Sequence, residues 1–239
     1  MGNLSEIPQK LASVNEKISA AAKRASRDPA QIKLVVVSKG QPVEVIQAAI
    51  EAGVRIFGEN YPEESVAKIQ SLAAEDIEWH MIGHLQSRKA RLVSKHFQYM
   101  HSLDSLHLAE KLDKLLAEPG RVLPVLLEFN VGTELSKSGW QADNTETWSD
   151  LLSDVEKILS LPHLKVNGLM SMPPLTVTPD EARVYFKRLV GLRDYLRGRY
   201  PEQTWDELSM GTSSDFEVAI EEGATFIRIG TSILGPRPL

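Results

Sequence analysis

The sequence predicts an α/β fold, a closed (β/α)8 barrel of the TIM type that carries an extra helix at its amino end. Short β-branched or apolar runs alternate with helical stretches along the 239 residues, and eight such strand-helix units can be counted. Parallel strands need long connections, which right-handed helical crossovers supply. Because barrels of this kind run to about 200–250 residues as one domain, we expect residues 1–239 to form a single domain.

The first segment predicts an amphipathic helix that ends near Pro29. Its apolar residues recur at helical spacing: Leu4, Leu11, Val14, Ile18 and Ala21. Strands are then expected at 32–37, 55–57, 78–82, 99–102, 123–130, 164–170, 205–209 and 225–229. Helices are expected between them at 42–52, 62–73, 87–95, 106–117, 144–159, 179–197 and 213–222. Pro42 and Pro62 suit a first helical turn, and Gly53 and Gly223 suit the left-handed residue that ends a helix.

Composition excludes several classes of protein. The net charge of −5 argues against non-specific nucleic-acid binding. The absence of cysteine excludes disulfides, zinc-thiolate sites and thiol nucleophiles, and it fits a reducing cytoplasm. No signal-type start and no run of about 18 apolar residues is present. We therefore expect a cytoplasmic protein without nucleic-acid or membrane partners. We also expect a monomer, although composition does not determine the oligomeric state.

The residues that follow the strands should form the active site, because barrel enzymes place it at the carboxyl ends of their strands. These positions are polar and rich in glycine: Ser38, Lys39, Glu59, Asn60, Gly83, His84, Ser102, Asn130, Met170, Ser171, Ser209, Met210, Gly211, Gly230 and Thr231. After the first strand, Ser38-Lys39-Gly40 lacks the glycine fingerprint of an open dinucleotide-binding sheet. The polar loop 132–140, which includes Ser136, is a candidate mobile rim.

Lys39 ends the apolar run LVVV, so it should emerge at a crowded barrel mouth. Desolvation there disfavours the ammonium form and makes the amine a nucleophile for an aldehyde or ketone. The alternative is a lysine that caps the strand or binds an anion.

Two late segments, 208–213 and 228–231, each place glycine and hydroxyl residues just after a strand. Such loops commonly bind phosphate in barrels, with Ser209, Thr212 and Thr231 as candidate donors, although ordinary turns have the same composition. Arg228 should point inward if Ile227 and Ile229 face the helices, toward a ring nitrogen, a phosphate or a carboxylate such as Glu59.

His80 and His84 are four residues apart but lie on an expected strand, so they lack the shared helical face of a metal pair. We expect both to be core or hydrogen-bonded histidines, and no metal.

The sequence resembles the YggS/PROSC family of pyridoxal-phosphate-binding homeostasis proteins, whose barrel is similar to the alanine racemase N-terminal domain. The resemblance covers nearly the whole chain in order. It is carried by VVVSK at 35–39, FGENY at 57–61, WHMIGHLQSRK at 79–89, HSLD at 101–104, SKSG at 136–139, GLMSM at 168–172, LSMGTSSDFEVAIEEGAT at 208–225 and RIGTSILGPR at 228–237.

The resemblance implies a site for pyridoxal 5′-phosphate, held as a Schiff base on Lys39. Asn60 would lie beside the cofactor ring, and Arg228 would face the pyridine nitrogen. Phosphate would be held by Ser209, Gly230 and Thr231, with Met170, Met210 and Gly211 as further neighbours of the cofactor. Two departures from the family, Gly40 in SKGQP and Thr212 in SMGTS, alter the rim of the site without removing an anchor.

The resemblance further implies a role in vitamin B6 homeostasis, with possible delivery of the cofactor to apoenzymes, and not catalytic turnover. An arginine at the pyridine nitrogen weakens the electron sink that most pyridoxal enzymes use. The alternative is an amino-acid racemase-like enzyme on the same lysine, which needs a second base and usually a β domain. The chain ends ten residues after Ile229, so we expect no such domain. A lysine-dependent aldolase acting on sugar phosphates is a third possibility.

Overall fold

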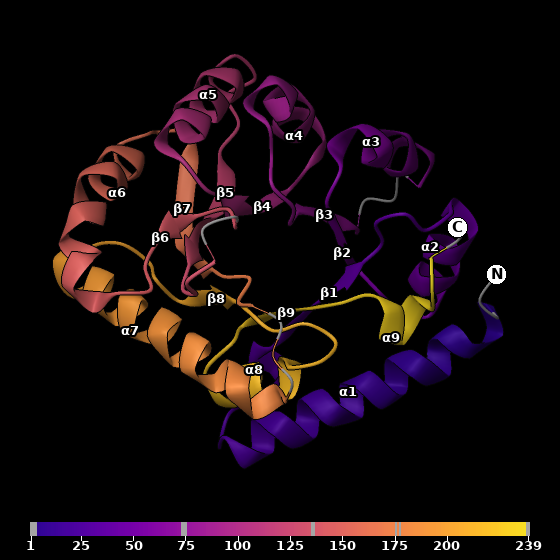
Figure 1. Ribbon diagram of the computed structural model, residues 1–239. Helices are drawn as coiled ribbons and strands as arrows, with labels where there is room; N and C mark the ends of the chain where they lie inside the picture. The colour runs from indigo at the N-terminus through magenta and orange to yellow at the C-terminus, as the bar shows by residue number, and fades with distance from the viewer. Residues whose placement is uncertain (1–3, 73–75, 135–136, 175, 177, 238–239) are drawn as a thin grey trace.

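A computed structural model describes residues 4–72, 76–134, 137–174, 176 and 178–237. In these residues eight parallel strands form a closed barrel surrounded by helices (Figure 1). The barrel strands are β1 (Lys33–Val37), β2 (Ile56–Glu59), β3 (Glu78–Met81), β4 (Tyr99–Leu103), β5 (Leu123–Asn130), β7 (Leu164–Met170), β8 (Glu207–Ser209) and β9 (Phe226–Ile229). Their order is β4-β3-β2-β1-β9-β8-β7-β5, and the pairing of β5 with β4 closes the barrel.

The helices are α1 (Ile7–Arg24), α2 (Val43–Glu51), α3 (Pro62–Ser71), α4 (Ala90–His96), α5 (Leu106–Ala117), α6 (Leu152–Leu159), α7 (Arg183–Arg199), α8 (Phe216–Glu221) and α9 (Thr231–Leu234). Helices α1 to α8 lie in the predicted segments, whereas α9 was not predicted, because only a short tail was expected after the last strand. Gly53 and Gly223 adopt positive φ after α2 and α8, as the sequence predicts. The predicted fold class, a (β/α)8 barrel with an extra amino-terminal helix, is confirmed.

Some boundaries differ from prediction. The expected helices at 144–159 and 179–197 begin as 3-10 turns, Thr145–Leu151 and Pro179–Ala182. The helix expected from 213 starts at Phe216, because the Asp215 carboxylate accepts the Thr212 backbone N–H at 2.6 Å and holds a turn there. The expected loop 132–140 runs into a two-residue strand, β6 (Trp140–Gln141), which pairs with β5.

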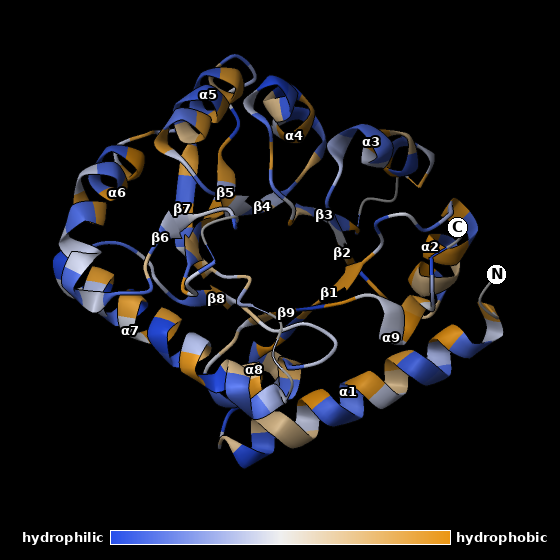
Figure 2. Ribbon diagram, viewed as in Figure 1, coloured by the Kyte–Doolittle hydropathy of each residue, from blue (hydrophilic) through white to orange (hydrophobic). Residues whose placement is uncertain are grey.

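Helix α1 fills a gap in the outer ring. The last two helices, α8 and α9, are six and four residues long, too short to cover β9 and β1 alone. Helix α1 packs against both of them along the side of the barrel (Figure 1). Apolar and polar residues alternate along it, as expected of a helix buried on one face (Figure 2). The guanidinium of Arg27 fixes its end by donating to the carbonyls of Ile220 and Ala224.

The core has two parts because barrel strands alternate their side chains between two surfaces. A large apolar cluster lies between strands and helices. A smaller cluster fills the barrel interior, and its buried members are Val35, Ile82, Tyr99, Leu126, Met170 and Phe226. Several polar side chains share that interior, among them His80, His101, Glu128, Ser209 and Arg228. Each of these buried polar groups needs a partner, and their partners define the site described below.

Candidate functional site

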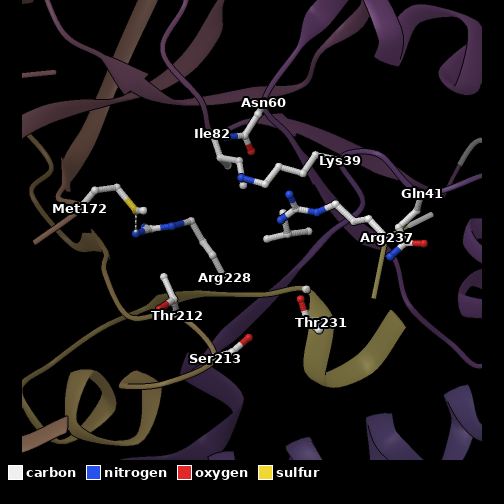
Figure 3. Close-up of a pocket in the computed structure, with 12 residues that line it drawn as sticks. Lys39, Gln41, Asn60, Ile82, Met172, Thr212, Ser213, Arg228, Thr231 and Arg237 are labelled. Atoms are coloured by element: carbon white, nitrogen blue, oxygen red, sulfur yellow. Dashed lines mark hydrogen bonds between the residues drawn. The ribbon is translucent and has the colours of Figure 1, made fainter. Parts of the chain in front are cut away.

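A cavity of about 170 Å³ opens at the carboxyl ends of β1, β2 and β9. It is lined by Val37, Lys39, Gln41, Asn60, Ile82, Met172, Thr212, Ser213, Arg228, Gly230, Thr231 and Arg237. Figure 3 shows Lys39 and Arg237 reaching into the same space, with Asn60 beside Lys39 and with Thr231 and Ser213 on the opposite wall. The position agrees with the rule that barrel sites lie at the carboxyl ends of strands.

A tight turn after β1 directs Lys39 into the cavity. The N–H of Gln41 donates to the Ser38 carbonyl at 3.0 Å, and Gly40 supplies the positive φ of 67° that the turn needs. Partial burial lowers the pKa of Lys39, the neighbouring Arg237 lowers it further, and Glu59 opposes the shift. The amine is therefore more readily deprotonated than an exposed lysine, as the sequence predicts.

Glu59, at the end of β2, fixes the base of this turn. Its buried Oε1 accepts hydrogen bonds from Ser38 Oγ at 2.8 Å and from Lys68 Nζ at 3.1 Å. The ammonium of Lys68 also donates to the Ser38 carbonyl, so helix α3 is tied to the end of β1. The alternative of a salt bridge between Arg228 and Glu59 is not realised, because Lys68 takes that place.

Asn60 follows β2 and contributes an unusual acceptor. Its Oδ1 atom is buried and has no hydrogen-bond partner within the described part of the chain. Gly83 lies against it so closely that a Cβ there would come within 2.7 Å of the Asn60 Cα. A buried acceptor without a donor costs about 1–3 kcal/mol, so a ligand that donates to it would recover that cost.

Arg228 points into the barrel, as predicted, because Ile227 and Ile229 pack outward in the large cluster. One terminal nitrogen donates to Ser209 Oγ at 2.5 Å, and the other donates to the Ser171 carbonyl at 3.0 Å and lies 2.8 Å from Met172 Sδ. Burial lowers the pKa of Arg228 to about 10, while Glu128 and Asp215 oppose the shift. The group stays cationic at neutral pH without a direct carboxylate contact among the described residues.

The loop after β8 and the start of α9 form the remaining wall. Gly211 has φ 90°, and a Cβ on it would come within 2.5 Å of the Ala219 Cβ, so the loop can pass close to α8 only with glycine. A Cβ on Gly230 would lie 3.1 Å from the Val37 carbonyl oxygen. The hydroxyl residues Ser213 and Thr231 line the cavity beside this tight packing.

The charged residues that line the cavity are all positive in the described chain. Lys39, Arg228 and Arg237 are cations, and no described lining residue is an aspartate or glutamate. An anion placed here would meet three positive groups, hydroxyl donors and exposed backbone. A phosphorylated ligand that carries a carbonyl group matches this donor set and the nucleophilic Lys39.

The structure brings together five of the predicted site residues: Lys39, Asn60, Arg228, Gly230 and Thr231. The other four predicted residues, Met170, Ser209, Met210 and Gly211, do not line the cavity. Met170 is in the barrel interior and Met210 in the outer cluster, and Gly211 packs on α8. Ser209 is fully buried, and its hydroxyl contacts Arg228 and His101.

Sequence reasoning missed several lining residues, Arg237 above all. The carboxyl-terminal segment after α9 folds back over the mouth, where Gln41 Nε2 donates to the Gly235 carbonyl at 3.2 Å. The only available signal was the basic residue in GPR at 235–237, since no strand or helix places it.

The structure agrees with the prediction that His80 and His84 are core or hydrogen-bonded histidines. His80 is buried and hydrogen-bonded to Glu78 and His101, while His84 is exposed and lies 2.6 Å from Asp104. No group of three or more histidine or carboxylate side chains among the described residues could hold a metal.

None of the described helices is both long and apolar enough to span a bilayer. Ser136, in the predicted mobile rim, lies outside the described residues.

The described part of that rim is anchored. Lys137 Nζ donates to the carbonyls of Met172 and Pro173, at 3.2 and 2.7 Å. Asn130 Nδ2 donates to the Glu134 carbonyl at 2.8 Å.

The fold and the lysine at the end of β1 define a barrel of the alanine racemase type, and the family model described as alanine racemase, N-terminal domain, matches residues 10–238. Two relatives called pyridoxal phosphate homeostasis protein are each 41% identical to this chain. The one from Aquifex aeolicus aligns over 96% of this chain and 97% of its own length, and the one from Escherichia coli K12 over 98% of both.

Among solved structures, PipY of Synechococcus elongatus PCC7942 is 36% identical to this chain. The match covers 96% of this chain and all of PipY, with TM-scores of 0.84 for the form without PLP and 0.82 for the form with PLP bound. The chain therefore belongs to the YggS/PROSC family of pyridoxal phosphate homeostasis proteins.

Proposed function

We propose that this protein binds pyridoxal 5′-phosphate in the cavity at the barrel mouth, covalently attached as a Schiff base on Lys39, and that it serves vitamin B6 homeostasis. Family membership supports the cofactor, since relatives carry that name and PipY was solved with PLP bound. The observation that carries the proposal is the position of Lys39. Its pKa is lowered, and it shares the cavity with two further cations and no described carboxylate.

The lining residues fit the groups of this cofactor. The hydroxyls of Ser213 and Thr231, the backbone at Gly230 and the Arg237 guanidinium offer donors to a phosphate. The unpartnered Asn60 Oδ1 offers an acceptor beside Lys39. These residues stand on opposite walls, as a ligand with a phosphate at one end and an aldehyde on its ring requires (Figure 3).

Arg228 limits the chemistry of the site. With a pKa of about 10 it remains protonated at neutral pH, and a guanidinium can only donate hydrogen bonds. A pyridine nitrogen facing it must therefore accept and stay unprotonated, which weakens the electron sink used in carbanion chemistry. When bound, pyridoxal phosphate supplies an aldehyde that condenses with a primary amine and releases one water molecule. The residues present favour reversible capture over turnover.

A racemase-like enzyme on the same lysine is less well supported. It needs a second acid-base group facing Lys39, and the described lining residues include no histidine, tyrosine, aspartate or glutamate. We therefore propose a cofactor-holding protein that can pass its cargo to apoenzymes. The transfer can be tested by mixing loaded protein with an apoenzyme and a scavenger of unbound pyridoxal phosphate, where recovery of apoenzyme activity is expected.

The first experiment is the visible absorption spectrum of the protein loaded with pyridoxal phosphate, followed by borohydride reduction and peptide mass mapping. We expect a yellow protein with the reduced adduct on the Lys39 peptide. Lys39→Ala should lose the covalent adduct entirely while it keeps its fold by circular dichroism. Lys165→Ala, at an exposed position of β7, is the matched control and should keep the adduct. A borohydride-stable adduct in Lys39→Ala, or a wild-type protein that cannot be loaded, would contradict the proposal.

A further inference from the structure

A chain of hydrogen-bonded side chains runs through the barrel interior from its amino end to the cavity. Glu78, the first residue of β3, lies 3.1 Å from His80 Nε2, and His80 Nδ1 lies 2.9 Å from His101 Nε2. The chain continues from His101 Nδ1 to Ser209 Oγ at 2.8 Å, and Ser209 accepts from Arg228 at 2.5 Å. Both histidines are buried, whereas the Glu78 side chain is 58% exposed. The chain thus joins solvent at one end of the barrel to Arg228 in the cavity wall.

The two ends fix the direction of every hydrogen bond. Arg228 can only donate to Ser209, so the Ser209 hydroxyl has its own hydrogen available for His101 Nδ1. His101 then carries its hydrogen on Nε2 and donates to His80 Nδ1. His80 in turn carries its hydrogen on Nε2 and donates to the Glu78 carboxylate. Each link has one donor and one acceptor.

The reverse direction fails at the carboxylate. If His101 carried its hydrogen on Nδ1, its Nε2 would accept from His80 Nδ1, and His80 Nε2 would be an acceptor facing an ionised Glu78 at 3.1 Å. It would also leave the Ser209 hydrogen without a partner in the chain. The geometry therefore selects neutral histidines with both hydrogens on Nε2.

The surroundings keep the histidines neutral. Tyr99 and Phe226 pack against both rings, with ring centroids 4.7–5.8 Å apart. Burial lowers the pKa of both histidines; Glu78 partly offsets it for His80, while the neighbouring His80 and Arg228 lower that of His101 further. The other charged groups that act on the pair are Lys33 and Glu207, which are paired with each other at 2.5 Å. A second proton on His80 would set its Nδ1–H against the His101 Nε2–H and break the chain.

We propose that Glu78, His80, His101 and Ser209 form a relay of positioning residues that fixes the Arg228 guanidinium and makes the cavity sensitive to an exposed carboxylate at the opposite end of the barrel. Without the relay, the Arg228 nitrogen that donates to Ser209 has no fixed acceptor, because the contacts of Arg228 with the Ser171 carbonyl and Met172 Sδ are made by its second terminal nitrogen. The inference rests on the proposed function only for the identity of the ligand that Arg228 meets.

The relay is tested first in the protein without ligand. Two-bond proton–nitrogen correlation spectra of protein labelled with ¹⁵N-histidine distinguish a protonated from an unprotonated ring nitrogen. At pH 7.5 we expect His80 and His101 to carry hydrogen on Nε2 only, with His84, His96, His107 and His163 as internal references. A hydrogen on Nδ1 of either buried histidine would overturn the relay, whatever the ligand of the cavity is.

Two variants test continuity from opposite ends. Ser209→Ala should shift the His101 nitrogen signals and weaken pyridoxal phosphate binding by about tenfold or more, the effect of one hydrogen bond to a charged group. Glu78→Gln, at an exposed site that tolerates change, should shift His80 and also His101, and weaken binding about twofold. The controls are Ser94→Ala, which removes a buried hydroxyl in α4, and Glu207→Gln, which removes a charge at the same end of the barrel.

The outcomes separate the two proposals. Unchanged binding in Ser209→Ala, or a Glu78→Gln variant in which only His80 shifts, would show that the side chains do not act as one relay. If wild-type protein cannot bind pyridoxal phosphate, the proposed function fails, while the histidine spectra still decide whether the relay exists. Equal effects in the Glu207→Gln control would reduce the Glu78 effect to through-space electrostatics and overturn the coupling.

Discussion

Two buried carboxylates at the barrel mouth have opposite surroundings. Glu59, on β2, accepts hydrogen bonds from Ser38 and Lys68 and stabilises the turn that carries Lys39. Glu128, on β5, has no ion pair with a cation in the described chain; its Oε2, like that of Glu59, is buried without a hydrogen-bond partner. Burial and, to a smaller extent, Asp104 raise the pKa of Glu128 to about 7, against the opposing effects of Arg228 and His84.

Glu59 is therefore a structural carboxylate that stabilises the turn that carries Lys39, whereas Glu128 is a carboxylate that is costly to keep ionised. Lys68 pairs with Glu59 outside the lining, and the charged residues that line the cavity in the described chain are all cations. Glu128 has no such partner, and it lies close enough to Arg228 for each to affect the pKa of the other. The β2 side of the mouth is therefore preorganised for an anion, whereas the β5 side can change its charge near neutral pH.

The strongest test of this comparison is Glu59→Gln. The substitution leaves Lys68, whose side chain is only 12% exposed, without its counter-charge and buries a new amide N–H without an acceptor. We expect the free energy of unfolding to fall by about 2–4 kcal/mol, measured by urea denaturation at pH 7. The pKa of Lys39 should fall too, since Glu59 raises it. Glu44→Gln, on the surface helix α2, is the control, and a loss of stability no larger than in that control would contradict the role given to Glu59.

Glu128→Gln should behave in the opposite way. In the folded protein the carboxyl has a pKa of about 7 against an ordinary value of 4.5, so folding favours its protonated form. The contribution of Glu128 to the free energy of unfolding of the wild type is thus lost as the pH rises from 4.5 to 7. The variant, which has no carboxyl group at this position, does not lose that contribution. Relative to wild type, Glu128→Gln should gain at most about 3 kcal/mol over this interval. Denaturation curves at pH 4.5, 6 and 8 measure the gain, and a difference that does not change with pH would refute the elevated pKa.

Much of the fold could be predicted because long periodic segments determine it. The helix at 106–117 and the strands at 123–130 and 164–170 have the predicted bounds, since their apolar patterns are long and unambiguous. The strand β6 was missed because two residues carry no periodic signal. The first turns at 145–151 and 179–182 adopt 3-10 geometry, a distinction that apolar spacing does not encode.

The candidate site was predicted in part for the same reason. Lys39, Asn60, Arg228, Gly230 and Thr231 belong to strand ends or to the turns just after them, so the barrel rule places them together. The rule fails to distinguish inward from mouth-facing side chains: Ser209 ends β8 but points into the barrel toward His101. Arg237 depends on a tail that folds back through a tertiary contact, which no local pattern predicts.

The smallest effect is expected for Arg237→Ala, which removes one of the three cations that line the cavity. Its guanidinium lines the cavity and lowers the pKa of Lys39, and its Cδ lies 3.1 Å from where a Cβ on Gly40 would stand. Because Arg237 is exposed, we expect pyridoxal phosphate to bind only about three- to fivefold more weakly, an effect that high salt reduces. The Lys39 amine should titrate at higher pH, so the pH profile of covalent capture should move toward alkaline values. Arg91→Ala, on α4, should change neither quantity. If Arg237→Ala weakens binding but leaves the pH profile of covalent capture unchanged, Arg237 contacts the phosphate and does not lower the pKa of Lys39. The contrast between the β2 and β5 sides of the mouth would then depend on Glu59 and Glu128 alone.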